Sequence, residues 1–250
     1  MEEIKISVVT VTFNAVARLS ALIDTLRAQT DRNFEWVVVD GGSTDGTVDL
    51  IKGADDVVGK WVSEPDFGIY HAINKALSMA SGDYYLVVGS DDRLHPHAIR
   101  RYREVIAESA ADIITACIKV DESIVKPGRR PAWLHAQAAY VSGHSVGALI
   151  RTRLHSRFGY YSRRFPIAAD QYFLKKALGG GASLAVSDFV AGEYSSQGLS
   201  GVDVLGTLCE IYRVQMETEK SPLLQTLIFM LRLLKNFPTI VTRVRRTGEA

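Results

Sequence analysis

The chain has 250 residues, of which 47% are hydrophobic and 23% are charged, the balance of a folded globular protein rather than a disordered one. The formal net charge of +1 gives no electrostatic basis for binding nucleic acid, so no nucleic-acid partner is expected. The two cysteines, Cys117 and Cys209, cannot form a zinc site or a disulfide framework, and we predict reduced cysteines in the core.

The N-terminus, MEEIKISVV, is acidic and passes directly into a strand-like run. It has neither the basic start nor the apolar core of a signal peptide. We therefore expect a cytoplasmic protein.

Strand-like and helical patterns alternate along the first 120 residues. Runs rich in valine, isoleucine and aromatic residues predict strands at residues 4–12, 34–40, 57–63, 82–92 and 112–120. Apolar residues at helical spacing predict helices at residues 19–26, 44–53, 69–80 and 95–109. This alternation predicts an α/β fold whose central sheet is mostly parallel and covered by helices on both faces.

The alternation weakens after residue 120. Residues 121–143 are polar and contain two prolines, which predicts a long loop or short irregular elements, often a functional feature of compact domains. Beyond this loop the pattern predicts, in order, a strand at 144–152, a helix at 170–178, a strand with an edge segment at 182–194, and helical structure from 202 to about 235.

Several predicted strands end in acidic or small polar residues, at 12–14, 40–43, 64–66 and 90–92. Ligands of open α/β sheets bind at the carboxyl ends of the strands. Carboxylates there suit a hard divalent cation or the hydrogen-bond donors of a base or sugar. The alternative is that aspartate and glycine are simply good turn residues. A dinucleotide-binding glycine motif and a P-loop are both absent from the sequence.

Five segments of the sequence occur in an order and spacing that resemble a known family: ISVVTVTFNAVARL, VVVDGGSTDGT, EPDFGIYHAINKAL, SGDYYLVVGSDDRL and IAADQYFLKKAL. Together they resemble family 2 glycosyltransferases with the GT-A fold, especially bacterial members that build surface polysaccharides. The resemblance covers about residues 4–200. It implies a GT-A catalytic domain at 1–201, with a nucleotide-sugar-binding half at 1–120 and an acceptor half at 121–201, followed by a C-terminal helical extension at 202–250.

The resemblance implies transfer of a sugar from a nucleotide-diphosphate donor, with a UDP-sugar expected, to an acceptor hydroxyl with inversion at the anomeric carbon. The expected acceptor is a glycan or a lipid-linked molecule. The departing diphosphate needs a Lewis acid, which implies Mn²⁺ or Mg²⁺ as cofactor, and the attacking hydroxyl needs a carboxylate base. The alternatives are a sugar nucleotidyltransferase, which usually has a glycine-rich phosphate loop where this chain reads TFNAVARL, and a non-catalytic nucleotide-sugar-binding subunit.

Two adjacent acids stand where the family binds its metal. By the resemblance, Asp92 is the metal ligand and Asp91 faces the sugar or ribose. In an extended strand their side chains would point in opposite directions, so the pair can act together only if the strand has already turned. The alternative is that the pair caps the next helix.

Five further residues are expected on the donor side, and two of them, Asp40 and Asp66, match positions of the family. Asp40 is expected to accept a hydrogen bond from the nucleobase, and Asp66 to lie in the uridine region. Thr12 and Asn14 are expected near base or ribose, with a helix cap as the alternative for Asn14. Lys75 is expected on the donor side, with a solvated helix face as its alternative.

Asp170 matches the general base of the family at the start of a helix. An unperturbed aspartate has a pKa of about 3.9, which is low for a base that takes a proton from an alcohol. We expect apolar neighbours, among them Phe165, Ile167 and Phe173, to raise it. The alternative is an ordinary acid in a helix's first turn.

His144 matches a histidine of similar sequences, where it would ligate the metal or contact the diphosphate; a satisfied core histidine is the alternative. His71 departs from the pattern, because many relatives carry aspartate there, and its role is open. The remaining histidines are expected at the surface: His95, His97, His135 and His155.

Two loops are expected to contact the donor or the acceptor. Residues 195–201, SSQGLSG, resemble a loop that closes over the donor diphosphate, with an ordinary mobile loop as the alternative. Arg129 and Arg130 could meet an anionic acceptor such as a lipid-linked pyrophosphate, although solvated arginines are the simpler interpretation.

The C-terminal segment is apolar and basic. Its apolar run at residues 223–234 is too short to span a bilayer. No acidic residue lies near its basic side chains, Arg232, Lys235, Arg243, Arg245 and Arg246. This pattern predicts an amphipathic helix in peripheral contact with the inner face of the plasma membrane. The alternative is a helix that packs on the catalytic domain or across a homodimer interface.

Overall fold

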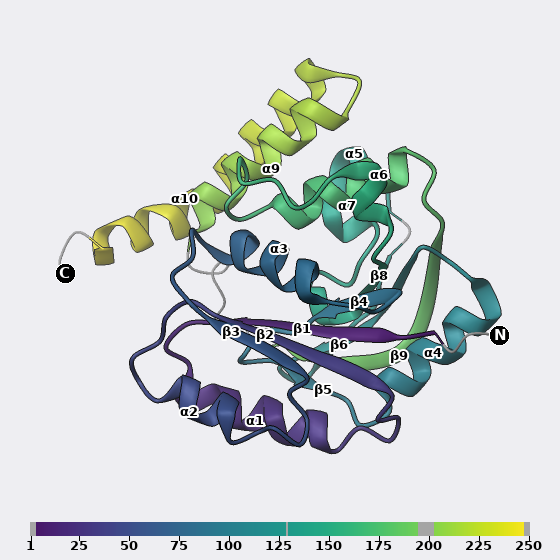
Figure 1. The fold of residues 1–250 in the computed structure, drawn as a ribbon. Coiled ribbons are helices and arrows are strands. Elements are labelled where there is room, and N and C mark those ends of the chain that lie inside the picture. Colours follow the sequence, from purple (N-terminus) through teal and green to yellow (C-terminus); the bar gives the residue numbers. More distant parts are fainter. Residues whose placement is uncertain (1–3, 129, 195–202, 248–250) are drawn as a thin grey trace.

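The computed structural model describes residues 4–128, 130–194 and 203–247 of the chain, and Figure 1 shows a central sheet with helices on both faces. The strands are β1 (Ile6–Thr12), β2 (Phe34–Asp40), β3 (Lys60–Ser63), β4 (Tyr84–Val87), β5 (Arg93–Leu94), β6 (Ile113–Val120), β7 (Ser123–Val125), β8 (Ala148–Arg151) and β9 (Leu184–Tyr194). They form one sheet in the order β3-β2-β1-β4-β8-β6-β9-β5, with β7 beside β6.

Helices and short 3₁₀ turns connect the strands. The helices are α1 (Val16–Arg27), α2 (Thr47–Lys52), α3 (Ile69–Met79), α4 (Ala98–Ser109), α5 (Ala132–His135), α6 (Leu154–Phe158), α7 (Ala169–Gly179), α9 (Val204–Thr218) and α10 (Pro222–Thr247). The 3₁₀ turns are η1 (Ala136–Ala139) and η2 (Ser145–Gly147). The predicted loop at 121–143 thus contains the short irregular elements β7, α5 and η1.

The sheet is parallel in its first half and mixed beyond it. Strands β1 to β4 pair in parallel, as the alternating pattern predicts. Strand β8 then runs antiparallel to both of its neighbours, β4 and β6. Residues 184–194 form one strand, β9, which pairs with β6 on one side and with the two-residue β5 only at Gly192 and Glu193 on the other.

Two hydrophobic cores cover the two faces of the sheet. One packs α1, α2 and α4 against inward-facing strand residues such as Val8, Trp36 and Leu86. The other packs α3, α6 and α7 against residues such as Val9, Val37 and Tyr85. Because neighbouring residues of one strand face opposite cores, the strands read as continuous apolar runs.

The register of the parallel strands brings their polar ends to one edge of the sheet. Thr12 at the end of β1 lies opposite Asp40 at the end of β2. Asp40 in turn lies opposite Ser63 at the end of β3. The rim predicted at the carboxyl ends of the strands is therefore present.

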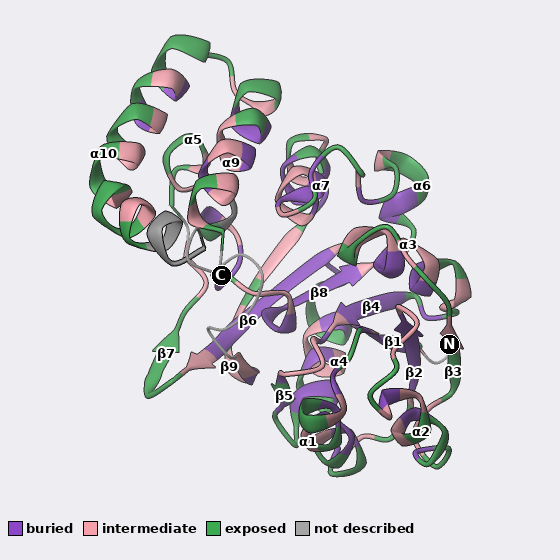
Figure 2. Cartoon of the chain, turned by 90° about the vertical axis from the view of Figure 1, so that its left-hand side faces the viewer, coloured by how far each residue is buried: buried purple, intermediate pink, exposed green. Residues whose placement is uncertain are grey.

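The helical structure predicted from 202 to about 235 consists of two helices, and the second continues to Thr247. Helix α9 ends at Thr218, and α10 begins with Pro222, a residue favoured at the first position of a helix. Val214 of α9 belongs to the core around α7. The rings of Tyr212 and Phe229 stack between α9 and α10, with centroids 4.5 Å apart. Figure 2 shows that the opposite side of α10 is exposed.

Glu35 of β2 joins the starts of several strands. Its carboxylate accepts hydrogen bonds from the Ser7 hydroxyl, at 2.6 Å, and from the hydroxyl and backbone N–H of Ser81. The ammonium groups of Lys5 and Lys60 lie 3.4 Å and 3.3 Å away. Burial alone would raise the pKa of Glu35, but these hydrogen bonds and the charge of Lys5 outweigh it and lower the pKa to about 2.

We predict that Glu35→Gln lowers the free energy of unfolding by about 2 kcal/mol at neutral pH, allowing for solvent screening of the exposed lysines. A depressed carboxyl pKa stabilises the fold fully above the unfolded pKa of 4.5, and that contribution is lost as the pH falls toward about 2. Urea unfolding across this range should therefore show the difference between wild type and variant shrinking. Glu104→Gln, which removes a partly exposed, ion-paired carboxylate, is the control and should change little. An equal effect of both variants would contradict the prediction.

Candidate active site

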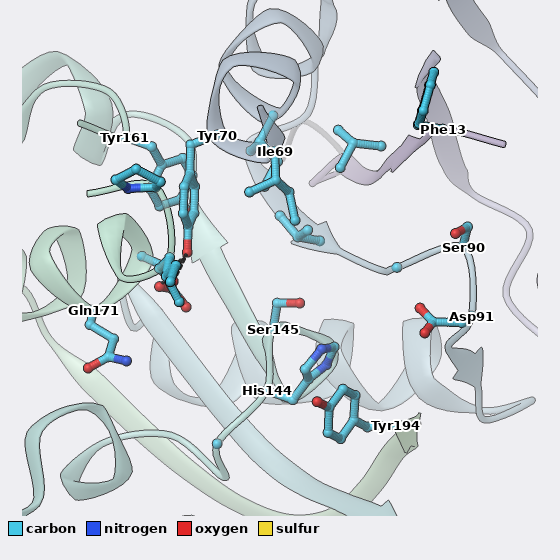
Figure 3. Close-up of a pocket in the computed structure, with 18 of the residues that line it drawn as sticks. Phe13, Ile69, Tyr70, Ser90, Asp91, His144, Ser145, Tyr161, Gln171 and Tyr194 are labelled. Atoms are coloured by element: carbon cyan, nitrogen blue, oxygen red, sulfur yellow. Dashed lines mark hydrogen bonds between the residues drawn. The ribbon is translucent and has the colours of Figure 1, made fainter. Parts of the chain in front are cut away.

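A cavity of about 840 Å³ opens where the carboxyl ends of the strands meet the segment before α7. Figure 3 shows Tyr70 and Gln171 on one side of it, Ser90 and Asp91 on the other, and His144 with Tyr194 between them. Of the predicted site residues, three line the cavity: Asp91, His144 and Asp170. Lining residues that sequence reasoning did not single out include Phe13, Arg18, Tyr70, Tyr161, Gln171 and Tyr194.

The loops that follow β1 and β2 hold each other in place. Asn14 has a φ of 46°, donates its backbone N–H to the Ser43 hydroxyl, and accepts a hydrogen bond from the Thr44 N–H on its side-chain oxygen. Its side chain does not cap α1, so that alternative is wrong. Instead, Asp45 accepts from the first N–H of the helix, that of Val16. The two loops therefore form one rigid wall at the strand ends.

Asp40 is fully buried, and its carboxylate stabilises the turn that follows it. Its carboxylate accepts hydrogen bonds from the backbone N–H groups of Gly42 and Ser43, at 3.0 Å and 2.8 Å. It also accepts from the hydroxyls of Ser43 and Ser63. Asp40 does not line the cavity, so its predicted contact with the nucleobase remains a prediction, and in this structure its carboxylate shapes the loop.

Asp66 lies over the same loop. One of its oxygens accepts a hydrogen bond from the Gly68 N–H at 2.8 Å. The other lies only 2.9 Å from where a Cβ on Gly41 would stand, so a side chain at position 41 would collide with it. The ring of Phe13, which lines the cavity, borders the same position. Asp66 is therefore close to the cavity end formed by β1 and β2.

The other two donor-side residues lie off the cavity wall. The hydroxyl oxygen of Thr12 is buried, with no hydrogen-bond partner in the described part of the chain. Lys75 pairs with Glu64, the two charged groups being 2.5 Å apart. Neither residue lines the cavity, and their predicted donor contacts remain untested.

Asp91 and Asp92 lie in a tight turn after β4. The turn is closed by the Asp92 N–H, which donates to the Gly89 carbonyl, and by the Gly89 N–H, which donates to Asp92 Oδ2 at 2.7 Å. A Cβ on Gly89 would stand 3.0 Å from oxygens of both acids, so glycine allows them to converge. Helix α4 is preceded by His97 rather than by the acids, so the capping alternative is wrong.

The environment of Asp92 fits a cation. Its side chain is buried, and burial together with the charge of Asp91 raises its pKa to about 8, against the lowering effect of the hydrogen bond from Gly89. Its Oδ1 is buried without a hydrogen-bond partner among the described residues. The Nδ1 atom of His144 lies 3.6 Å from Asp92 Oδ2. A buried, unpaired carboxylate oxygen beside an imidazole is an arrangement that a divalent cation satisfies.

His144 stacks on Tyr194, with ring centroids 3.9 Å apart. Burial lowers its pKa to about 4, which keeps the ring neutral and able to ligate a metal at neutral pH. No group of three or more metal-ligating side chains occurs in the described ranges. A cation held by Asp92 and His144 would therefore need further ligands from water or a bound phosphate, as Mg²⁺ commonly takes.

Asp170 stands in the first turn of α7 and lines the cavity. The apolar neighbours expected to surround it, Phe165 and Phe173, are buried in the core. The Tyr70 hydroxyl lies 2.7 Å from Asp170 Oδ1. A hydrogen bond to a carboxylate favours the ionised form, which is the form a general base requires.

His155 is buried, contrary to the expected surface position. Its ring stacks on Phe173 at 4.3 Å, and its Nε2 lies 2.8 Å from the Tyr85 hydroxyl. The cause is helix α6, which the sequence pattern did not predict and which turns this residue toward α7. Arg130 is exposed, as expected of a solvated arginine, whereas Arg129 and the loop at 195–201 lie outside the described residues.

Known proteins resemble this chain in sequence. The model for glycosyl transferase family 2 matches residues 7–178. An uncharacterised glycosyltransferase of Mycobacterium tuberculosis is 29% identical over 178 residues, which cover 69% of this chain and 68% of the relative. A glycosyltransferase of PGL/p-HBAD biosynthesis from Mycobacterium bovis is 37% identical over 92 residues, 36% of each chain.

Two solved structures share the fold at low sequence identity. Staphylococcus aureus TarS 1–349 in complex with UDP has a TM-score of 0.68 and 21% identity, covering 94% of this chain and 72% of TarS 1–349. The mannosyltransferase PcManGT from Pyrobaculum calidifontis, in complex with GDP-Man and Mn²⁺, has a TM-score of 0.67 and 17% identity, covering 98% and 75%. The predicted GT-A fold is thereby confirmed.

Proposed function

The chain belongs to glycosyl transferase family 2, and we propose that it transfers a sugar from a nucleotide-diphosphate donor, a UDP-sugar by preference, to an acceptor hydroxyl with inversion at the anomeric carbon. One observation supports the proposal: a single cavity is lined both by Asp91, in the turn that also carries Asp92, and by Asp170 at the start of a helix. In the proposal, the turn holds the metal and diphosphate, and Asp170 is the base. The TarS complex with UDP supports this donor class.

The chemistry requires one bond to form as another breaks. The Asp170 carboxylate takes the proton of the acceptor hydroxyl, whose oxygen attacks the anomeric carbon from the face opposite the diphosphate. The bond between that carbon and the phosphate oxygen breaks, and its electron pair leaves with the diphosphate. Asp92 and His144 would hold Mn²⁺ or Mg²⁺, which supplies a Lewis acid for the departing charge. Arg18, which lines the cavity 4.0 Å from Asp91, adds a fixed positive charge there.

Turnover of a donor panel tests the proposal. Purified protein with Mn²⁺ should release nucleoside diphosphate from one class among UDP-glucose, UDP-N-acetylglucosamine, GDP-mannose and dTDP-rhamnose. Once an acceptor is found, NMR of the product should show the anomeric configuration opposite to that of the donor. Failure to release diphosphate from any donor would contradict the enzyme assignment, and retention of configuration would contradict the single-displacement mechanism.

The outer face of α10 supports a location at the membrane. Its exposed side chains form an apolar stripe, Leu223, Leu227, Met230, Leu231, Leu234 and Phe237, each more than half exposed. The helix contains no acidic residue, and the sequence adds arginines at 243, 245 and 246. No helix in the described ranges is both long and apolar enough to cross a bilayer. We propose peripheral contact with an anionic membrane, where a lipid-linked acceptor would lie.

Replacing Leu227, Leu231 and Leu234 together by glutamine should lower binding to phosphatidylcholine–phosphatidylglycerol vesicles at least ~10-fold, because it removes apolar surface without breaking the helix. Ile124→Gln, at an exposed apolar residue of β7, is the matched control and should bind like wild type. Sedimentation distinguishes the competing homodimer: a wild-type dimer that the triple variant converts to monomer would contradict the membrane assignment.

A further inference from the structure

The segment that leads into α7 is held from two directions. From α3, the Tyr70 hydroxyl has two acceptors within reach, the Ile167 carbonyl oxygen at 2.9 Å and Asp170 Oδ1 at 2.7 Å, and its single proton serves the closer, charged one. From α9, the Glu210 carboxylate accepts hydrogen bonds from the backbone N–H groups of Ile167 and Ala168, at 2.8 Å and 2.9 Å. Glu210 is only 8% exposed, so water competes little for these bonds. The backbone two residues before Asp170 is therefore fixed between the nucleotide half and the C-terminal helices.

Tyr70 also reaches the side chain of Asp170. Its hydroxyl lies 2.7 Å from Asp170 Oδ1, a distance typical of a hydrogen bond to a carboxylate. Burial, together with the charge of Asp170, raises the pKa of Tyr70 well above its usual value. The hydroxyl thus keeps its proton at physiological pH and acts as a donor (Figure 3).

We propose that Tyr70 is a positioning residue for the base: it fixes the orientation of the Asp170 carboxylate and favours its ionised form, while Glu210 fixes the backbone that carries Asp170. This inference rests on the proposed function, in which Asp170 takes the proton of the acceptor hydroxyl. Tyr70 retains its own proton throughout, so its contribution is geometric and electrostatic. In this proposal, helix α9 helps to position the base through Glu210.

The other titratable groups near Asp170 offer a matched control. The charge of Asp170 also contributes to raising the pKa of two buried tyrosines, Tyr85 of β4 and Tyr161 of the segment before α7. Tyr85 is fully buried and places its hydroxyl 2.7 Å from that of Tyr161. Tyr85→Phe therefore removes a buried hydroxyl of the same kind without removing the contact at 2.7 Å to Asp170.

The test is the pH dependence of transfer for wild type, Tyr70→Phe and Tyr85→Phe, with the donor identified in the panel. We expect Tyr70→Phe to lower kcat about 10-fold, to leave the donor KM within about twofold, and to move the acidic limb of the profile up by about half to one pH unit. Tyr85→Phe should leave that limb where it is. Coincident limbs for wild type and Tyr70→Phe would overturn the proposal.

Glu210→Gln separates the backbone contribution from the ionisation of the base. It should lower kcat without the upward shift of the limb expected for Tyr70→Phe, because it weakens the hydrogen bonds to the N–H groups of Ile167 and Ala168 and removes a negative charge rather than a hydrogen-bond donor. Unchanged kcat in this variant would overturn the role of α9. If the wild-type protein turned over none of the donors, the proposed function would be refuted, and the inference with it. If the wild-type protein is active and Tyr70→Phe has the same kcat and the same acidic limb, the inference alone is refuted.

Discussion

Replacing Asp170 by asparagine is expected to lower kcat for sugar transfer by about 10³-fold, since the acceptor hydroxyl would lose the group that takes its proton. The amide is nearly isosteric with the carboxylate and stays within reach of the Tyr70 hydroxyl, so the fold and the donor site should be unaffected. Initial rates with saturating donor, together with calorimetric binding of the matching nucleoside diphosphate, measure the two effects separately.

Asp188→Asn is the matched control for this prediction, because Asp188 is an exposed acid of β9 that does not line the cavity. It should transfer at the wild-type rate. An Asp170→Asn variant with the wild-type rate would remove Asp170 from the mechanism and leave the base unidentified. Loss of nucleotide binding together with rate would instead assign Asp170 to the donor site.

The second large effect is expected at Asp92. Asp92→Asn should lower transfer at least ~100-fold and raise the Mn²⁺ concentration needed for half-maximal rate, because the amide oxygen is a weaker ligand than a carboxylate. The substitution also leaves a buried position filled, so its effect on folding should be small compared with its effect on the rate. Titration of the transfer rate with Mn²⁺ and with Mg²⁺ measures the change for both metals.

Asp49→Asn serves as the control for Asp92, since the Asp49 side chain is 85% exposed and does not line the cavity. Its metal titration should match that of wild type. A rate for Asp92→Asn that is unchanged at every metal concentration would show that this carboxylate holds no metal in the reaction, and the pairing of Asp92 with His144 would then be structural.

Much of the fold could be predicted from the sequence where one local signal dominates. The strand at residues 34–40 is recovered with its bounds, because an apolar run is flanked by Asn33 and ends in Asp40. The C-terminal helices show the limit of this approach. Apolar spacing continues from α9 into α10, and the break at residues 219–221 is marked only by Ser221 before Pro222, a signal of a new helix start.

The candidate site was less predictable, because its geometry depends on contacts between distant segments. An aspartate before two glycines and a serine can either receive a ligand or order its own turn, and the sequence cannot tell these roles apart for Asp40. Tyr70 lies in a helix whose apolar spacing indicates a core position, while its acceptor, Asp170, is 100 residues further along the chain. Asp92 and Asp170 could be chosen from the resemblance, but not the groups that surround them.

The most direct test of the account is calorimetric titration of the wild-type protein with UDP, GDP, dTDP and CMP, each with and without Mn²⁺. The account predicts that one nucleoside diphosphate, with UDP expected, binds in the presence of Mn²⁺ and much more weakly in its absence, because the diphosphate completes the ligand set of a cation held by Asp92 and His144. Binding of none of the four nucleotides under either condition would contradict the assignment of this cavity as a nucleotide-sugar site.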